Sequence, residues 1–163
     1  MQIGILSDTH GKLPTAVLKI FNNVQHIFHA GDIGDISIIH ELETICPVSA
    51  IHGNIDPWPI PNLYPNILVT SISGLQIVMK HDIVAFKEYS YELFKKRIQP
   101  DIVIYGHTHQ PMATYYRNIY YINPGSTTKP RSGYKSSVVI LTIDSNDSKK
   151  IDTRFYELEK AGD

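Results

Sequence analysis

The sequence predicts an α/β fold in which two mixed β-sheets pack face to face and carry helices on their outer surfaces. In residues 1–56, short apolar segments alternate with segments of helical periodicity, which is the pattern of βαβ units and a parallel sheet. In residues 66–156, most apolar segments come in pairs joined by a short turn, which is typical of antiparallel hairpins. The chain of 163 residues has the length of one domain, so we expect residues 1–163 to form a single domain.

The first half of the chain supplies three strands and two helices. Pro14 suits the first turn of a helix over residues 13–24, in which Val17, Phe21 and Val24 form an apolar stripe. The expected strands cover residues 2–6, 26–30 and 48–52, and the second helix covers residues 36–45.

Prolines mark the change to the second half. Four of them between residues 57 and 65 predict an extended loop without regular structure. An apolar run from Asp101 to Tyr105, rich in β-branched residues, predicts a buried strand. The other expected elements are a hairpin of residues 66–73 and 75–80, a helix over residues 87–98, a hairpin of residues 113–117 and 119–122, and a hairpin of residues 137–143 and 150–156.

Charge and composition narrow the class of protein. The net charge of −1 gives no electrostatic footprint for nucleic acid or for an anionic membrane. Cys46 is the single cysteine, so the chain cannot form an internal disulfide. No segment has the apolar length of a membrane span or the pattern of a signal peptide. These features predict a soluble cytoplasmic protein.

Side chains that bind metals follow five of the predicted strands. Ligands of open α/β sheets bind in the crevice beyond the carboxyl ends of the strands, so these side chains should meet there. In Gly106-His107-Thr108-His109, a glycine turn after a buried strand can aim two imidazoles into one small volume. The seven candidate ligands are Asp8, His10, Asp32, Asn54, His81, His107 and His109.

The number and chemistry of these ligands favour two metal ions. Seven ligands exceed the three or four that one zinc ion takes from a protein, and they suit two ions if one carboxylate bridges them. Asp32 is the expected bridge, because a carboxylate has about four lone-pair sites. Two divalent ions with two carboxylates leave a charge of about +2, which a hydroxide and a phosphodiester anion would neutralise. The mixture of imidazole, carboxylate and amide favours transition metals, with manganese expected and nickel, iron, zinc or cobalt as alternatives.

Five motifs, in chain order, resemble those of the calcineurin-like metallophosphoesterase superfamily: Asp8-Thr9-His10, Gly31-Asp32, Gly53-Asn54, His81 and Gly106-His107-Thr108-His109. The chain length and residues 123–131 resemble the small phosphodiesterase branch of that superfamily. The resemblance covers nearly the whole chain and implies a four-layer α/β/β/α sandwich of two mixed sheets with a dinuclear metal centre. It also implies a first metal held by Asp8, His10, Asp32 and His109, and a second held by Asp32, Asn54, His81 and His107.

Two positions depart from the family pattern. Many relatives have a histidine directly after the Gly-Asn pair, where it is proposed to protonate the leaving oxygen or bind substrate, but this chain has Ile55. Without that acid, substrates with poor leaving groups should suffer most, because a general acid typically contributes 10²–10⁴-fold. The second departure is Asp82 after His81, where the family usually has glycine. Its carboxylate could narrow the pocket or orient an imidazole.

We therefore expect a metal-dependent phosphodiesterase that acts on a small-molecule phosphodiester. In the expected mechanism, a hydroxide bridging the two metal ions attacks phosphorus in line. Asp32 would space the ions, His107 would stabilise the developing charge, and Asn54 completes the set assigned to catalysis. The alternatives are a phosphomonoesterase using the same site, and a non-catalytic scaffold of the same fold for protein interactions.

Several residues near the predicted site have open roles. Asp56 and Arg131 are candidates for substrate contact, with turn capping and loop anchoring as the respective alternatives. His29 and His52 border the site, either as packing residues or in contact with ligands or substrate. Trp58 could line a substrate wall or pack on a sheet edge.

Four tyrosines occupy alternate faces of one predicted hairpin: Tyr115, Tyr116, Tyr120 and Tyr121. One face of the hairpin must be exposed, and an exposed tyrosine row suggests self-association into a homo-oligomer. Cross-strand pairing within the chain is the alternative.

Overall fold

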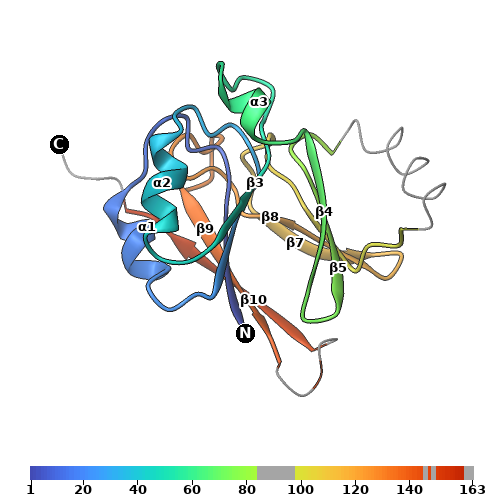
Figure 1. The fold of residues 1–163 in the computed structure, drawn as a ribbon. Helices are drawn as coiled ribbons and strands as arrows, with labels where there is room; N and C mark the ends of the chain where they lie inside the picture. The colour runs from blue at the N-terminus through green and yellow to red at the C-terminus, as the bar shows by residue number, and fades with distance from the viewer. Residues whose placement is uncertain (84–97, 145–146, 148–149, 160–163) are drawn as a thin grey trace.

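The structure of the chain is a computed structural model, and it describes residues 1–83, 98–144, 147 and 150–159. Two five-stranded sheets form its body, with the helices at one side (Figure 1). The strands are β1 (Gln2–Leu6), β2 (His26–His29), β3 (Val48–Ala50), β4 (Ile67–Ile72), β5 (Leu75–Lys80), β6 (Ile102–Ile104), β7 (Met112–Tyr116), β8 (Ile119–Asn123), β9 (Ser137–Ile143) and β10 (Ile151–Glu157). The helices are α1 (Thr15–Ile20), α2 (Ser37–Glu43) and α3 (Ile60–Leu63).

Both sheets are mixed, as predicted. The first sheet has the order β10-β9-β1-β2-β3, in which β1, β2 and β3 run parallel and β9 pairs antiparallel with β1. The second has the order β4-β5-β6-β8-β7, and its central strands β5, β6 and β8 also run parallel. The expectation of a mostly antiparallel second half is therefore wrong for the centre of this sheet. The edge strand β7 reverses the chain between β6 and β8, so these two neighbours share one direction.

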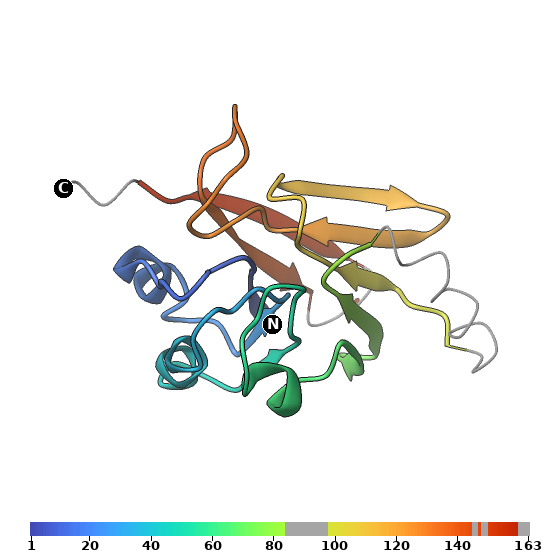
Figure 2. The ribbon, with the colours of Figure 1, turned by 90° about the horizontal axis from the view of Figure 1, so that it is seen from above.

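The two sheets bury an apolar core between them. This core contains Ile3, Ile5 and Phe28 of the first sheet, and Ile77, Ile102 and Ile122 of the second. A second core fills the space between the first sheet and the helices α1 and α2, which Figure 2 shows on the side away from β7 and β8. The helix expected over residues 87–98, which would supply a fourth layer, lies almost wholly outside the described residues.

The helices are shorter than the sequence predicts. The helix expected over residues 13–24 is restricted to α1, and the one expected over residues 36–45 to α2. The expectation that the proline-rich loop has no regular structure is wrong, since α3 forms one turn there with a proline in its first positions. A proline is tolerated at the start of a helix, where its missing N–H would have had no partner. None of the helices in the described ranges is long and apolar enough to cross a membrane.

The tyrosines of the β7–β8 hairpin pair across the two strands. The ring of Tyr115 lies 4.5 Å from that of Tyr120, and the ring of Tyr116 lies 6.5 Å from that of Tyr121, between centroids. Tyr115 and Tyr116 are nevertheless about 60% exposed. The cross-strand alternative accounts for the pairing, while the homo-oligomer stays a prediction.

The packing of β1 against α1 yields a test of the fold. A Cβ atom at Gly4 would lie 2.9 Å from the ring of Phe21, which is fully buried. We expect Gly4→Ala to lower the free energy of unfolding by about 1–3 kcal/mol, because overpacking forces the ring to shift. The measurement is urea unfolding followed by circular dichroism.

A double mutant separates this clash from a general effect of alanine at position 4. In a Phe21→Leu background, which removes the ring, Gly4→Ala should cost at least about 0.5 kcal/mol less than it does alone. Strictly additive losses in the double mutant would show that the contact between Gly4 and Phe21 does not limit packing.

Candidate metal centre

The seven candidate ligands all lie just beyond the carboxyl ends of strands. Asp8 and His10 follow β1, Asp32 follows β2, Asn54 lies four residues beyond β3, His81 follows β5, and His107 and His109 lie in the turn after β6. Backbone hydrogen bonds join these turns. The N–H of Asp8 donates to the oxygen of Gly31 (3.0 Å), that of His10 to the oxygen of Asp32 (3.0 Å), and that of Gly106 to the oxygen of His81 (3.0 Å).

Five of the seven candidate ligands have a left-handed backbone, with φ between +49° and +64°: Asp8, His10, Asp32, His107 and His109. Side chains other than glycine rarely adopt this conformation, although Asp, Asn and His tolerate it best. Such strain persists only where the surrounding structure enforces it, and it concentrates at functional sites. Here it turns the side chains of separate loops toward a common centre.

The first cluster consists of Asp8, His10, Asp32 and His109. One ligand atom from each of these four residues lies within 4.8 Å of all the others. The Nε2 atom of His109 is 3.0 Å from Oδ1 of Asp8. The two carboxylates are almost wholly buried, with exposed fractions of 0% for Asp8 and 3% for Asp32. This cluster is the same set that the family resemblance implies for the first metal.

The remaining candidate ligands, His81, His107 and Asn54, form a second group that adjoins Asp32 through His81. The Nε2 atom of His81 lies 3.3 Å from Oδ2 of Asp32 and 3.9 Å from Oδ1 of Asp8. Asn54 and His107 meet at the exposed rim, where Oδ1 of Asn54 is 3.1 Å from Nδ1 of His107. The rings of His81 and His107 are 5.4 Å apart between centroids. Asp32 therefore adjoins both groups, as a bridging ligand must.

Three glycines allow the loops to approach the ligands this closely. A Cβ atom at Gly53 would overlap Oδ1 of Asp32, and one at Gly106 would lie 2.8 Å from Oδ2 of Asp8. A Cβ atom at Gly31 would lie 2.7 Å from Nδ1 of His81. Any larger residue at these positions would displace a candidate ligand, so the adjacent glycines are required by geometry.

Buried polar atoms without partners test whether this donor set suits metal ions. Among the described residues, Oδ2 of Asp8 and both ring nitrogens of His10 are buried without a hydrogen bond, while Oδ1 of Asp8 and Nε2 of His81 have only the ion-pair contacts described above. Leaving such groups unsatisfied costs about 1–3 kcal/mol each, and more for charged groups. Metal ions would satisfy these atoms, so the residues present fit a metal centre.

The electrostatics of the cluster favour bound cations. Burial lowers the pKa of His81, but its interaction with the Asp32 carboxylate and the charge of Asp8 outweigh this effect and raise the pKa above its usual value. The Asp8 carboxylate likewise raises the pKa of His109. Burial lowers the pKa of His10, which favours the neutral imidazole that binds metals. Two buried carboxylates thus attract positive charge into the site.

Comparisons with known proteins agree with this geometry. A family model described as the calcineurin-like phosphoesterase superfamily domain matches residues 1–146. The chain belongs to the calcineurin-like phosphoesterase superfamily. A probable metallophosphoesterase of Methanocaldococcus jannaschii is 34% identical over 159 residues, covering 93% of this chain and 81% of that protein. A phosphodiesterase of the same organism is 30% identical over 175 residues, covering 98% of this chain and all of that protein.

Solved structures of this superfamily share the fold. An archaeal phosphodiesterase superposes with a TM-score of 0.74 at 27% identity, covering 97% of this chain and 100% of that one. Vacuolar protein sorting 29 of Cryptosporidium parvum superposes with a TM-score of 0.73 at 19% identity, covering 98% of each chain. The chain is therefore a phosphoesterase relative with the expected pair of mixed sheets. Its likeness to vacuolar protein sorting 29 concerns the fold alone.

Three residues with open roles have defined contacts. Both carboxylate oxygens of Asp56 accept backbone hydrogen bonds, from Gly34 (2.6 Å) and Gly53 (2.8 Å), which favours a structural role over substrate contact. Arg131 is exposed, and its Nε donates to the oxygen of Thr108 at 3.4 Å. Asp82 Oδ2 lies 3.9 Å from Nε2 of His107, so its carboxylate adjoins an imidazole of the second group of candidate ligands.

Sequence reasoning missed Asn123 and Thr128, which together with Ser126 hold the ligand turns in place. Ser126 and Thr128 donate side-chain hydrogen bonds to the backbone oxygen of Asp8, at 3.0 and 3.3 Å. Asn123 donates to the oxygen of Gly106 at 2.8 Å. For Ser126, as for Arg131, the sequence allows either loop anchoring or contact with a substrate phosphate, and these hydrogen bonds favour anchoring. The glycine turn within residues 123–131 was a signal for an anchoring segment of this kind.

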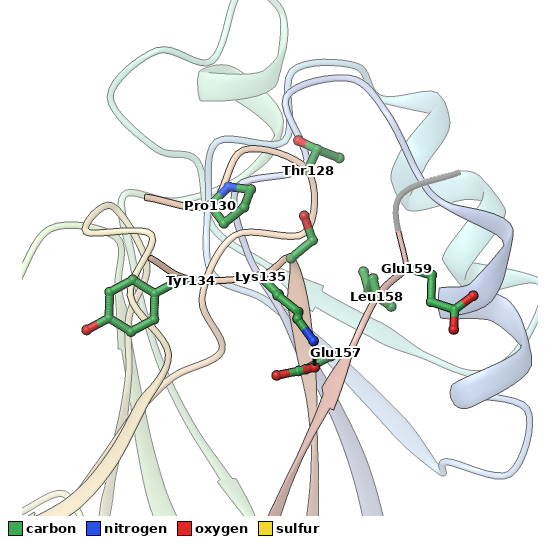
Figure 3. A pocket seen from close by; sticks show the side chains of 8 residues that line it. Thr128, Pro130, Tyr134, Lys135, Glu157, Leu158 and Glu159 are labelled. Carbon is green, nitrogen blue, oxygen red and sulfur yellow. Dashed lines mark hydrogen bonds and ion pairs between the residues drawn. The ribbon is translucent and has the colours of Figure 1, made fainter. Parts of the chain in front are cut away.

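A cavity of about 510 Å³ lies behind this anchoring segment (Figure 3). It is lined by Thr128, Pro130, Tyr134, Lys135, Ser136, Glu157, Leu158 and Glu159, which include none of the seven candidate ligands. Lys135 and Glu157 form an ion pair of 2.6 Å at its edge. The cavity is thus separate from the metal cluster.

His29 links the first two ligand turns as a neutral histidine. The backbone N–H of Gly31 donates to its Nδ1 (3.3 Å), so Nε2 carries the proton and donates to Oγ1 of Thr9 (2.9 Å). Thr9 in turn donates to the oxygen of Ile33 (2.9 Å). Complete burial lowers the pKa of His29 to about 4. His29 is therefore a fully buried residue that bonds to Thr9 and Gly31, which adjoin candidate ligands in the sequence.

This histidine should make folding stability depend on pH. Between a pKa of about 6.5 in the unfolded chain and about 4 in the folded one, the unfolded chain alone binds the proton. We therefore expect stability to fall as the pH drops through this window, by up to about 3 kcal/mol from this group. Urea unfolding at a series of pH values measures it.

Comparison with His29→Gln isolates this group from the other histidines. The glutamine variant should be less stable than the parent at neutral pH, and the difference should shrink as the pH falls toward 4. His40→Gln, at an exposed helix position, is the matched control, and its stability should depend on pH as that of the parent does. A difference between His29→Gln and the parent that stays constant with pH would contradict the assignment.

Proposed function

We propose that this chain is a phosphodiesterase that works with two divalent metal ions. The observation that carries the proposal is the first cluster, in which four ligand atoms from three loops converge within 4.8 Å and the buried Oδ2 of Asp8 and ring nitrogens of His10 have no hydrogen bond among the described residues. The superfamily membership supports the metal-dependent hydrolysis of phosphate esters. The phosphodiesterase among the relatives supports a diester substrate.

Asp32 is the residue on which a two-ion site depends. In the proposal, Asp8, His10, Asp32 and His109 hold one ion, and Asp32, Asn54, His81 and His107 hold the other. When bound, the two ions would supply Lewis acidity that activates water and neutralises charge on the phosphoryl group. The imidazole, carboxylate and amide donors favour manganese, with nickel, iron, zinc or cobalt as alternatives.

The burial pattern separates the residues that neutralise charge from those that face the substrate. Asp8 and Asp32 are buried, so their carboxylates can neutralise the charge of the ions without contacting the substrate. His107 and Asn54 lie at the exposed rim, within hydrogen-bonding distance of each other. His107 would bind the second ion through one ring nitrogen and can donate a hydrogen bond to a phosphoryl oxygen through the other. Oδ2 of Asp82 lies 3.9 Å from Nε2 of this ring and would help to orient it.

The charge of the site favours a diester over a monoester. Two divalent ions and two carboxylates leave a charge of about +2. A diester, with one negative charge, leaves about +1 for an anionic nucleophile. A monoester, with a charge near −2, neutralises the site completely and leaves no positive charge to attract an anionic nucleophile. Turnover of mono- and diesters with the same leaving group compares the two, and a non-catalytic scaffold would hydrolyse neither.

Removal of the bridging carboxylate tests the two-ion site. We expect Asp32→Ala to lower the metal content from two ions per chain to less than one, because both groups of ligands lose a member. Turnover of an activated diester should fall by more than about 100-fold, beyond the loss typical of an outer hydrogen-bond partner. Elemental analysis and steady-state kinetics with manganese measure the two effects.

Asp35→Ala is the matched control, since Asp35 is an exposed aspartate that binds the backbone and hydroxyl of Ser37. It should retain both ions and normal turnover. If Asp32→Ala folds, binds two ions and turns over diesters normally, the proposed centre is refuted.

The side chain at position 55 predicts how the rate depends on the leaving group. Ile55 is 56% exposed beside Asn54 and can give no proton to a departing oxygen. We expect the rate to fall steeply along a series of diesters as the leaving group becomes more basic. Ile55→His should restore part of the loss, within the 10²–10⁴-fold that a general acid supplies.

The nitrophenyl end of the series provides the internal control, because a good leaving group needs no acid. Ile55→His should leave that rate nearly unchanged. A shallow dependence in the parent chain would mean that another group supplies the proton.

A further inference from the structure

The loop that follows Asn54 exposes a group of large apolar side chains. Trp58 is 80% exposed, Ile55 is 56% exposed and Leu63 is 54% exposed. Packing of Trp58 on a sheet edge, one of the two roles left open by the sequence, is excluded by this exposure. Burying an indole is strongly favourable, so leaving one in water indicates that something else covers it.

The structure holds this tryptophan in place although it packs against little of the chain. On one side, Asp56 is fixed by its two backbone hydrogen bonds to Gly34 and Gly53. On the other side, Ile60 is 1% exposed and anchors α3 in the core. Pro57 and Pro59 flank the indole and restrict the backbone between these anchors. A backbone held in this way loses little entropy when a ligand covers the indole.

The loop begins at the candidate metal centre. The N–H of Ile55 donates to Oδ1 of Asp32 at 3.2 Å. Trp58 lies only four residues beyond Asn54, so their Cα atoms are at most about 14 Å apart. Figure 1 shows α3, at the end of this loop, standing beyond the carboxyl end of β3. The exposed indole is thus close to the place where a bound diester would extend its organic groups.

We propose that Trp58, with Ile55 beside it, is a stacking platform for a planar aromatic group carried by the substrate. The inference rests on the proposed function, because it takes the substrate to be a phosphodiester. The metal ligands can bind only the phosphoryl group, so recognition of the organic part must come from the rim. The net charge of −1 argues against a polynucleotide and for a small molecule, such as a nucleotide diester or an aryl diester.

Fluorescence tests the platform without any turnover. Trp58 is the only tryptophan of the chain, so its emission reports on this position alone. Adenosine monophosphate and phenyl phosphate carry an aromatic group, whereas ribose 5-phosphate carries the phosphate without one. We expect a saturable change in emission with at least one of the aromatic probes and none with ribose 5-phosphate. Equal responses to all three probes, or no response to any, would overturn the proposal.

Kinetics then test the effect on specificity with three diesters that share a nitrophenyl leaving group. Their second arms are a nucleoside, a phenyl group and a methyl group. We expect Trp58→Ala to lower kcat/KM about 5- to 100-fold for an aromatic second arm, mainly through KM, and to leave the methyl diester nearly unchanged. Trp58→Phe should retain most of the preference, because it keeps an aromatic face.

The matched control is Tyr116→Ala, which removes another exposed aromatic side chain, 58% exposed, from the β7 edge. It should change none of the three rates. A loss confined to the nucleoside or to the phenyl diester supports the platform and identifies its ligand, whereas an equal loss on all three overturns it. If no diester is hydrolysed, the proposed function fails, and the fluorescence titration alone decides whether the platform exists.

Discussion

Two carboxylates, Asp8 and Asp32, are buried together at one end of the sheets, and the charge of the rest of the site depends on this burial. Burial of ionised groups is costly unless they are paired or coordinate metals. In this chain the histidines around them supply only part of the compensation, since among the described residues Oδ1 of Asp8 has only its contacts with His109 and His81 and Oδ2 has no hydrogen bond. A centre of this kind is stable in water only with positive charge inside it, which is the condition for holding divalent ions.

The loops must be held against their own backbone preferences to create this centre. Left-handed conformations at five candidate ligands cost of order 1–3 kcal/mol each where they are strained. Hydrogen bonds from Asn123, Ser126 and Thr128 to the ligand turns supply part of the opposing stabilisation. The large apolar core between the sheets fixes the strand ends from which these turns start. The packed sheets thus provide the rigid support for the strained ligand turns.

The candidate ligands could be recognised from the sequence because each follows an apolar strand and several adjoin a glycine. These are local signals. The parallel pairing of β6 with β8 could not be predicted, because it depends on which edge β7 takes after the turn. The network through His29 and Thr9 was equally hidden, since it requires the directions of two side chains from separate loops. Side-chain direction and exposure also decide the role of Trp58, and its sequence neighbours gave no information on either.

The rim residues explain how one buried centre can be matched to particular substrates. Ile55 takes the position at which the family resemblance implies a histidine in many relatives. In the proposed reaction, the leaving group would therefore receive no proton from that residue and would need to be stable as an anion. Phenolates meet that requirement better than aliphatic alkoxides do, because the ring delocalises the negative charge. The same rim exposes an indole that an aromatic group can cover. The loss of an acid and the presence of an aromatic surface therefore favour the same class of substrate, and both features lie within four residues of Asn54.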